Sequence, residues 1–429
     1  MKIIKNEMKV LNELESALHA NGSLKEGTTI PLTSNATLDR SETSISAHVE
    51  NNSIVALTMR YCALTSPPES ISQLANLTLL DLADNQLSIL PTSLGNLLHL
   101  KKLYVDNNQL VTLPASLGNL HHLAEIHVDN NQLTALPESI NQLESLNVLS
   151  AYGNQLASIP TGFSQLITLK EISLGKNQLT SLPESFWELR DLQLLNIAEN
   201  RLTFISEHIG NLIGLSTLDL GHNELTSLPE ALGTLSNLTF FLYLSNNHLT
   251  SLPPSLGTLS NLIYLNATDN HLTSLPDSIG NLISLRELRL YNNELASLPE
   301  ILGNLRNLKE LHLMNNRLVS LPESLGNLTS LKELHLMNNP LASLPESLGN
   351  LSNLARLDLR NNRLIALPMS LGNLRSLTHL DLRGNRLVAL PECIGELPRL
   401  EKLDLRWNKL SSYPEWLKAL EQRGCIVFK

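Results

Sequence analysis

Two short segments of the same sequence carry side chains that could bind a metal ion. Both read His-Leu-Met-Asn, and the side chains in question are His312, Met314, His335 and Met337. If the segments are neighbouring strands, the two histidines stack about 4.8 Å apart. A metal ion needs a third and a fourth ligand, and only Glu310 and Glu333 stand nearby in the sequence. We therefore favour a contact surface with polarizable methionines over a metal site.

The other reactive residues do not form an enzyme motif. The sequence contains no glycine-rich phosphate loop, no G-x-S-x-G turn and no H-E-x-x-H pair. His121, His122 and His127 lack the spacing of a zinc pair on a helix. We therefore predict a protein that is not an enzyme and has no cofactor, metal or small-molecule substrate. The alternative is a substrate-recognition subunit of a larger enzyme assembly.

The composition excludes further classes of protein. No run of about 18 apolar residues is present, so no membrane span is expected. The first twenty residues mix lysine, glutamate and asparagine with apolar residues, unlike a signal peptide. Three cysteines are too few for a disulfide framework and favour a reducing, cytoplasmic location. The net charge of −10 disfavours nucleic acid as a partner.

The pattern L-x-x-L-x-L-x-x-N-x-L runs through most of the chain. The histidines and methionines described above therefore belong to a repeated unit, which must position them. Its asparagine recurs from Asn85 to Asn408, and Cys62 fills the same slot one unit earlier. From Cys62 to Asn408 fourteen steps are 23 residues long and one is 24, so the pattern predicts sixteen units. One unit buries too little apolar surface to fold alone, so the units must stack.

Each unit predicts a strand followed by a short helical turn. The x-L-x-L-x segment alternates with period two, which is typical of a strand with its leucines on one side. In the return Leu321–Leu328, Pro322 suits the first helical position and Gly326 lets the turn end tightly. The asparagine is expected to turn inward and to satisfy backbone groups of its own and the neighbouring unit.

These motifs resemble the leucine-rich repeat proteins, in the class with a 23-residue unit and an L-P-x-x-L-G-x-L return. The likeness covers roughly residues 54–410 and extends to Ras-pathway scaffolds, Roco repeat regions and bacterial repeat proteins. It implies an α/β solenoid shaped as a horseshoe, with a parallel sheet on the concave face and short helical turns on the convex face. Members of the family share a binding surface and not a reaction, so the resemblance implies protein binding.

Tyrosine gathers at the positions expected to face outward from the sheet. The third, fifth and seventh residues of the units hold five of the seven tyrosines, namely Tyr104, Tyr152, Tyr243, Tyr264 and Tyr291. Aromatic residues favour strands in general, but tyrosines on an exposed sheet can also be binding hot spots. We predict Tyr243, Tyr264 and Tyr291 as contacts with a partner. Trp407, one position further along at the rim, extends this set.

One extra residue intrudes near Phe240 and Phe241 and breaks the period. It is either a bulge that turns an aromatic side chain toward the concave face, or a local loop before the strand.

Charge is distributed unevenly along the repeats. Residues 54–238 carry a net charge of −10 and residues 239–429 a net charge of +2. Three predicted strand arginines each follow an aspartate by two residues, namely Arg360, Arg383 and Arg406. Cross-strand pairing between the arginine column and the aspartate column would neutralise much of their charge. A second basic column consists of Arg317, Arg363, Arg386 and Lys409. It has no acidic partner in register, and is the better candidate to meet an acidic partner protein.

The two ends of the chain differ from the repeats. Residues 1–53 are expected to form an amphipathic helix over 1–20 and then mostly loop, with an apolar stripe of Ile4, Met8, Leu11, Leu14 and Leu18. This segment is either a cap over the first repeat or a separate docking or translocation segment. Residues 411–429 are expected to form a closing cap with one helix and a final strand over 425–428.

Together these patterns predict a non-catalytic binding scaffold or recognition module. Its concave face would bind another protein, mainly over the ninth to the sixteenth unit. The alternative is a bacterial effector that is exported into a host cell without a cleaved signal peptide and binds a host protein.

Overall fold

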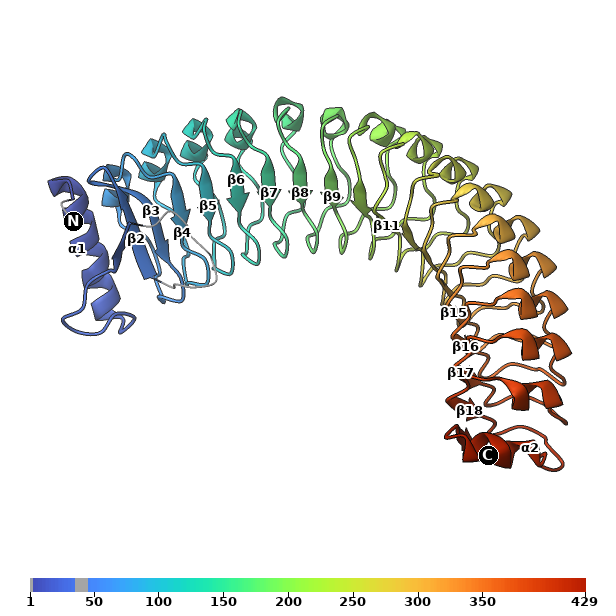
Figure 1. The fold of residues 1–429 in the computed structure, drawn as a ribbon. Helices are drawn as coiled ribbons and strands as arrows, with labels where there is room; N and C mark the ends of the chain where they lie inside the picture. Colours follow the sequence, from blue (N-terminus) through green and yellow to red (C-terminus); the bar gives the residue numbers. More distant parts are fainter. Residues whose placement is uncertain (1–2, 35–44) are drawn as a thin grey trace. The chain divides into compact units, whose positions relative to one another are not determined.

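The computed structural model describes residues 3–34 and 45–429, in two compact units. The N-terminal unit comprises Met1–Leu202 and Asn211–Leu215, and the C-terminal unit comprises Thr203–Gly210 and Ser216–Lys429. Both compact units are built from repeats, and each repeat has a short strand on one side and a 3₁₀-helical turn on the other (Figure 1). The predicted alternation of strands and short helical turns is therefore confirmed.

The strands are short and follow the predicted period. The N-terminal unit contains β1 (Leu32–Thr33), β2 (Ile45–Glu50), β3 (Ser53–Met59), β4 (Leu79–Asp81), β5 (Lys102–Tyr104), β6 (Glu125–His127), β7 (Val148–Ser150), β8 (Glu171–Ser173) and β9 (Leu194–Asn196). The C-terminal unit contains β10 (Thr217–Asp219), β11 (Phe241–Tyr243), β12 (Tyr264–Asn266), β13 (Glu287–Arg289), β14 (Glu310–His312), β15 (Glu333–His335), β16 (Arg356–Asp358), β17 (His379–Asp381), β18 (Lys402–Asp404) and β19 (Ile426–Phe428). Among the described residues, β3 to β18 correspond to the sixteen predicted repeats.

The helical segments alternate with these strands. Within the part of the chain that the structure describes, α1 (Lys5–Ala20) lies near the N-terminus and α2 (Trp416–Gln422) near the C-terminus. The 3₁₀ turns of the first half are η1 (Glu69–Gln73), η2 (Thr92–Asn96), η3 (Ala115–Asn119), η4 (Glu138–Gln142), η5 (Phe163–Gln165), η6 (Glu184–Glu188) and η7 (Glu207–Asn211). The later turns are η8 (Glu230–Thr234), η9 (Pro254–Thr258), η10 (Asp277–Asn281), η11 (Glu300–Asn304), η12 (Glu323–Asn327), η13 (Glu346–Asn350), η14 (Met369–Asn373) and η15 (Glu392–Glu396).

Parallel pairing in constant register places equivalent residues of successive repeats side by side. In the C-terminal unit Leu288 pairs with Leu311, and Leu311 with Leu334. These strand leucines are fully buried between the strands and the 3₁₀ turns. The residues that flank them lie on the opposite side of the sheet, called the sheet face below. Residues 23 apart therefore form columns on this face, and these columns position the candidate site.

The repeated asparagine joins neighbouring repeats, as predicted. Asn339 is buried, and its Nδ2 donates to the carbonyl oxygens of Leu336 at 3.1 Å and of Leu313 in the preceding repeat at 2.9 Å. Its Oδ1 accepts a hydrogen bond from the Leu318 amide at 3.1 Å. One side chain thus satisfies backbone groups that would each cost about 1–3 kcal/mol if buried without a partner. The rim, which is the turn after each strand, is held in place by these bonds.

Two details of the turn differ from the prediction. Pro322 does not occupy the first helical position, because it precedes η12 as an extended N-cap with φ −70° and ψ 148°. Gly326 lies inside η12 and does not terminate it. A Cβ at Gly326 would overlap the carbonyl oxygen of Ser347 in the next repeat. Glycine is therefore required here by the close approach of neighbouring turns and not by the end of the helix.

The N-terminal segment corrects two predictions. Ile4 and Met8 are 48% and 38% exposed, so they do not belong to the packed stripe of α1, which buries Val10 and Glu7 together with the predicted Leu11, Leu14 and Leu18. Within 23–53, the expectation of loop was also wrong for Ile45–Glu50, because this segment is β2 and pairs antiparallel with β3. Part of that range, 35–44, lies outside the described residues. The loop prediction failed because Ile45–Glu50 has a mixed polar sequence that is nevertheless buried by pairing.

Both ends of the chain contact the repeats. The buried Glu7 carboxylate accepts the Ile54 amide at 2.8 Å, and Asn21 Nδ2 donates to the Cys62 carbonyl oxygen at 2.7 Å. At the other end β19 pairs in parallel with β18, so the expected closing helix and strand are present. Within the described residues, neither α1 nor α2 combines the length and apolar character that a membrane crossing requires.

Candidate functional site

An aromatic cluster lies on the sheet face of the C-terminal unit. The rings of Phe241 and Tyr243 are stacked with centroids 5.8 Å apart, and Tyr264 lies 5.6 Å from Phe241 and 5.2 Å from Tyr243. The Arg289 guanidinium lies 5.6 Å from the centre of the Tyr264 ring. This arrangement joins strands β11, β12 and β13 and presents apolar ring surface beside a cation.

The extra residue near Phe240 does not form a bulge. Phe241, Leu242 and Tyr243 pair in continuous register with β10 on one side and β12 on the other. The additional residue lies before β11, as the loop interpretation predicted. Phe240 is 52% exposed and Phe241 is 40% exposed. Phe241 occupies a third position, so regular strand pairing alone, without a bulge, places it on the sheet face.

The predicted tyrosines are less accessible than expected. Tyr264 is only 9% exposed and Tyr104 only 6%, because neighbouring side chains of the sheet face cover their rings. Burial raises the pKa of Tyr264 to about 12 and also raises the pKa of Tyr243. Tyr243 and Tyr291 are half-buried. Phe241 and Tyr243 therefore offer the accessible part of the cluster, and Tyr264 packs beside them on the next strand.

The predicted histidine pair is present. The rings of His312 and His335 are stacked with centroids 4.7 Å apart and an interplanar angle of 8°. Burial, His335 and Arg289 together lower the pKa of His312 to about 4, although the Glu287 and Glu333 carboxylates oppose this shift. Met314 and Met337 each follow one of these histidines by two residues, and both are half-buried on the sheet face.

Carboxylates surround this histidine pair without making a convincing metal centre. Among the described residues, ligand atoms of Glu287, Glu310 and His312 lie within 4.8 Å of one another. Glu287 was not among the ligands predicted from the sequence, because only strand pairing brings it to this cluster. Arg289 Nε lies 2.5 Å from Glu287 Oε1, so a cation already neutralises that carboxylate. The preference for a contact surface over a metal site is therefore kept.

The strand arginines are neutralised by aspartates, as predicted, but their shortest contacts are with the aspartate of the same strand and not across strands. The Nη2 atoms of Arg360, Arg383 and Arg406 lie 2.5, 2.9 and 2.6 Å from carboxylate oxygens of Asp358, Asp381 and Asp404, respectively. Arg383 also reaches Asp404 on the next strand at 3.3 Å. These three predicted contact residues are therefore engaged within the protein and offer a partner little net charge.

The second basic column behaves differently, with one correction. Arg317 is not unpaired, because its Nη2 lies 2.9 Å from Glu294 Oε2 in the preceding repeat. Arg363, Arg386 and Lys409 are exposed and have no acidic partner among the described residues. They line an open groove of about 670 Å³ together with Trp407, which is 74% exposed. These four residues therefore offer an acidic partner an exposed aromatic ring and three cations without an acidic neighbour among the described residues.

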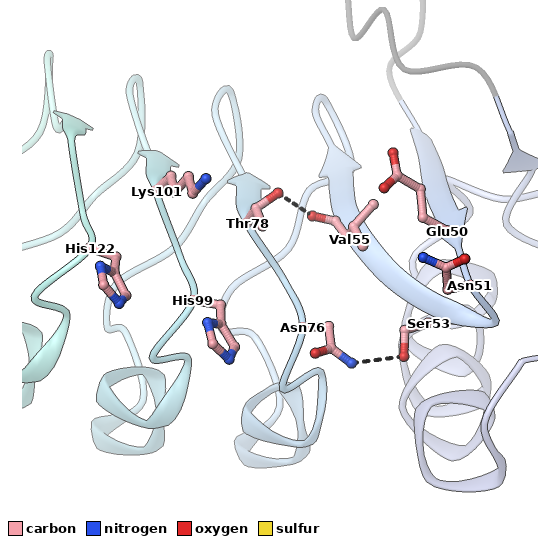
Figure 2. A pocket seen from close by; sticks show the side chains of 9 residues that line it. All are labelled: Glu50, Asn51, Ser53, Val55, Asn76, Thr78, His99, Lys101 and His122. Carbon is pink, nitrogen blue, oxygen red and sulfur yellow. Dashed lines mark hydrogen bonds between the residues drawn. The ribbon is translucent and has the colours of Figure 1, made fainter.

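The N-terminal unit contains a hollow that the sequence analysis did not find. It has a volume of about 600 Å³, and its lining includes Glu50, Asn76, His99, Lys101 and His122 (Figure 2). The rings of His99 and His122 are parallel with centroids 6.4 Å apart, and Asn76 Nδ2 donates to Ser53 Oγ at 2.9 Å. The signal in the sequence was a column with period 23, just before the first leucine of each unit.

Comparisons with known proteins agree with the repeat pattern. A family model described as a leucine-rich repeat region matches residues 92–197, 185–321, 250–360 and 321–423, and a model for a leucine-rich repeat matches residues 76–97. A search of curated proteins found no match.

Several solved structures resemble this one. A leucine-rich repeat protein of Leptospira interrogans is 36% identical with a TM-score of 0.79, over 87% of this chain and 95% of that one. The Arabidopsis receptor kinase HAESA, solved with the peptide hormone IDA and a co-receptor, is 26% identical with a TM-score of 0.68, over 98% of this chain and 80% of that one. Drosophila Toll, solved with Spätzle, is 27% identical with a TM-score of 0.72, over 83% of this chain and 50% of that one.

Proposed function

Since the chain belongs to the leucine-rich repeat proteins, we propose that it is a non-catalytic recognition module that binds another protein through the sheet face of its C-terminal unit. The fold supplies a row of strands whose outward side chains are held in register, so that little conformational entropy is lost on binding. The contact would centre on Phe241 and Tyr243 and continue past Tyr291 to His312, Met314, His335 and Met337.

The aromatic cluster is the observation that carries this proposal. Phe241 remains 40% exposed although its ring contacts both Tyr243 and Tyr264. Clustered aromatic side chains next to an arginine are typical of binding hot spots, because they bury a large area with few rotatable bonds. The similar structures of HAESA and Toll were solved with a peptide hormone and with Spätzle, respectively, which supports a protein or a peptide as the partner.

We propose a cytoplasmic location, and an exported effector that acts inside a host cell as the alternative. The free thiols support a reducing compartment, because Cys62 and Cys425 are buried and no disulfide joins the three cysteines, all of which lie in the described residues. Fractionation of the native organism, with and without a host, separates the two locations.

A photo-crosslinking experiment tests the proposed surface. Phe241 is replaced by a benzophenone amino acid, the protein is irradiated in its native cell, and adducts are identified by mass spectrometry. We expect a discrete protein adduct from this position. The same replacement at Phe204 is the matched control, because Phe204 is a 57% exposed phenylalanine of the same unit that lies outside the strands.

The captured protein is then tested for direct binding to the purified chain. We expect the double variant Phe241→Ala and Tyr243→Ala to lose at least about tenfold in affinity, because each truncation removes ring contacts. The proposal fails if Phe204 captures the same protein equally well, or if the double variant binds as tightly as the wild type.

A further inference from the structure

Six side chains of the last repeats form an amphipathic strip on the rim of the C-terminal unit. We define the rim strip as Arg363, Ile365, Arg386, Val388, Trp407 and Lys409. It lies beside the sheet face and does not include the aromatic cluster.

In two of the three repeats of the rim strip, an arginine and an aliphatic side chain flank a leucine. Leu364 and Leu387 are fully buried, whereas Ile365 and Val388 on one side of them are 61% and 58% exposed. Arg363 and Arg386 on the other side are exposed as well. Exposed apolar side chains beside unpaired cations give the rim strip two kinds of contact, one for apolar groups and one for carboxylates.

Backbone hydrogen bonds hold the cations of the strip in a row. The amide of Arg386 donates to the Leu364 carbonyl oxygen at 2.9 Å, and the amide of Lys409 donates to the Leu387 carbonyl oxygen at 3.0 Å. Arg363 is fixed in the same way to Leu341 at 2.9 Å. The three cations therefore lie one repeat apart on an ordered backbone, and they have no acidic partner among the residues that the structure describes.

Trp407 occupies a position that disfavours a large side chain. Its backbone is left-handed with φ 59°, at a place where the preceding repeats have Asn338, Asn361 and Gly384. Asparagine and glycine tolerate this conformation, whereas a bulky residue is strained in it. The ring is 74% exposed, and the Arg406 guanidinium lies 5.7 Å from its centre. A strained and exposed tryptophan does little for the fold, which points to a role in binding.

We propose that the rim strip binds an extended segment of a partner protein in which acidic and apolar residues alternate. This inference rests on the proposed function, because it supplies a second contact for the same kind of partner. Successive side chains of an extended segment point to opposite sides. One side would place carboxylates against Arg363, Arg386 and Lys409, and the other would place apolar side chains against Ile365 and Val388. Charge-assisted hydrogen bonds make the arginines the stronger contacts, and Trp407 closes one end of the groove.

Fluorescence anisotropy with a labelled peptide of alternating glutamate and leucine tests the proposal. We expect this peptide to bind the full chain and a glutamine–leucine peptide to bind at least about tenfold more weakly. Arg386→Glu should weaken binding by at least about tenfold, and added salt should weaken it further.

Trp407→Asn separates binding from stability. It should weaken peptide binding by about tenfold while the unfolding midpoint stays equal or rises, because asparagine tolerates the left-handed backbone. The matched control is Tyr61→Asn in the N-terminal unit. Tyr61 has φ 55°, is 67% exposed and has the Arg60 guanidinium 5.3 Å from its ring centre, but lies outside the rim strip. We expect this control to leave peptide binding unchanged.

Three results would overturn the proposal. These are equal binding of the two peptides, unchanged binding by Arg386→Glu, and binding to phosphatidylserine vesicles without binding to the peptide. The Phe241→Ala and Tyr243→Ala double variant should bind the peptide normally. If the rim variants have no effect while capture at Phe241 persists, the rim strip is wrong and the proposed function stands. If capture at Phe241 fails while the peptide binds the rim, the sheet face is wrong.

Discussion

His312 is the residue whose charge depends most clearly on its neighbours. Its side chain is 14% exposed, and its ring is stacked against His335. Burial disfavours the imidazolium form, and His335 and Arg289 add repulsion, so the pKa falls to about 4. At neutral pH His312 is therefore uncharged. The stacked histidine pair then offers a partner a flat polar surface beside Met314 and Met337.

This shift predicts a pH dependence of stability. The pKa of His312 is about 4 in the folded chain and 6.5 in its ordinary state, so between these values the unfolded chain binds the extra proton. Stability should therefore fall as the pH drops from 6.5 toward 4, by up to about 3 kcal/mol from this group. His312→Gln should flatten this part of the profile, measured by urea unfolding at each pH. The exposed His121→Gln should leave it unchanged. An unaltered slope in His312→Gln would show that other groups cause the loss.

The 3₁₀ turn is the element in which neighbouring repeats approach most closely. Gly326 faces the backbone of Ser347, and the same contact recurs between Gly303 and Ser324 and between Gly349 and Ser370. The hydroxyl groups of these serines are buried and have no hydrogen-bond partner within the described residues. Small size, rather than hydrogen bonding, thus explains why serine and glycine recur in this turn.

Substitutions in one turn test this explanation. Gly326→Ala should lower the free energy of unfolding by about 2 kcal/mol, because the added methyl group meets backbone that cannot move aside without displacing the next repeat. Ser324→Ala in the same turn should leave it unchanged or raise it by up to about 1–3 kcal/mol, because it removes a buried hydroxyl that forms no bond there. Urea midpoints measure both. Equal effects of the two substitutions would argue against close approach as the reason for glycine.

At the scale of the whole molecule, stability should be local, because each repeat contacts mainly its neighbours. Leu14 in α1 is fully buried at the start of the repeats. Leu14→Ala should cost about 3 kcal/mol and speed amide hydrogen exchange in β2, β3 and β4. Exchange in β14 to β17 of the C-terminal unit should keep its wild-type rate. Ile4→Ala, at a 48% exposed position, is the control.

The exchange pattern also tests the role of the N-terminal segment. Faster exchange confined to the first strands would support the cap, because removing its packing opens the adjacent core. Unchanged exchange in β2 to β4 would instead favour a separate docking segment that contributes little to the fold. Faster exchange along the entire chain would contradict local stability.

The period of 23 residues was sufficient to predict the repeats, the inward asparagine and the columns on the sheet face. Each of these follows from burying one set of leucines in every unit, so the pattern is visible in the sequence without knowledge of the neighbours. The stacking of His312 on His335 followed for the same reason, since both occupy one column.

Only the tertiary structure decided which side chains of those columns remain available. The pairing of Arg317 with Glu294, the burial of Tyr264 beside Phe241 and Tyr243, and the exposure of Trp407 depend on side-chain conformations in adjacent repeats. The repeat specifies where each Cα lies but not which way a long side chain turns. Charged groups and rings about 5 Å away in the next strand decide how each long side chain turns. For this reason, only Arg363, Arg386 and Lys409 of the predicted basic residues are exposed without an acidic partner among the described residues.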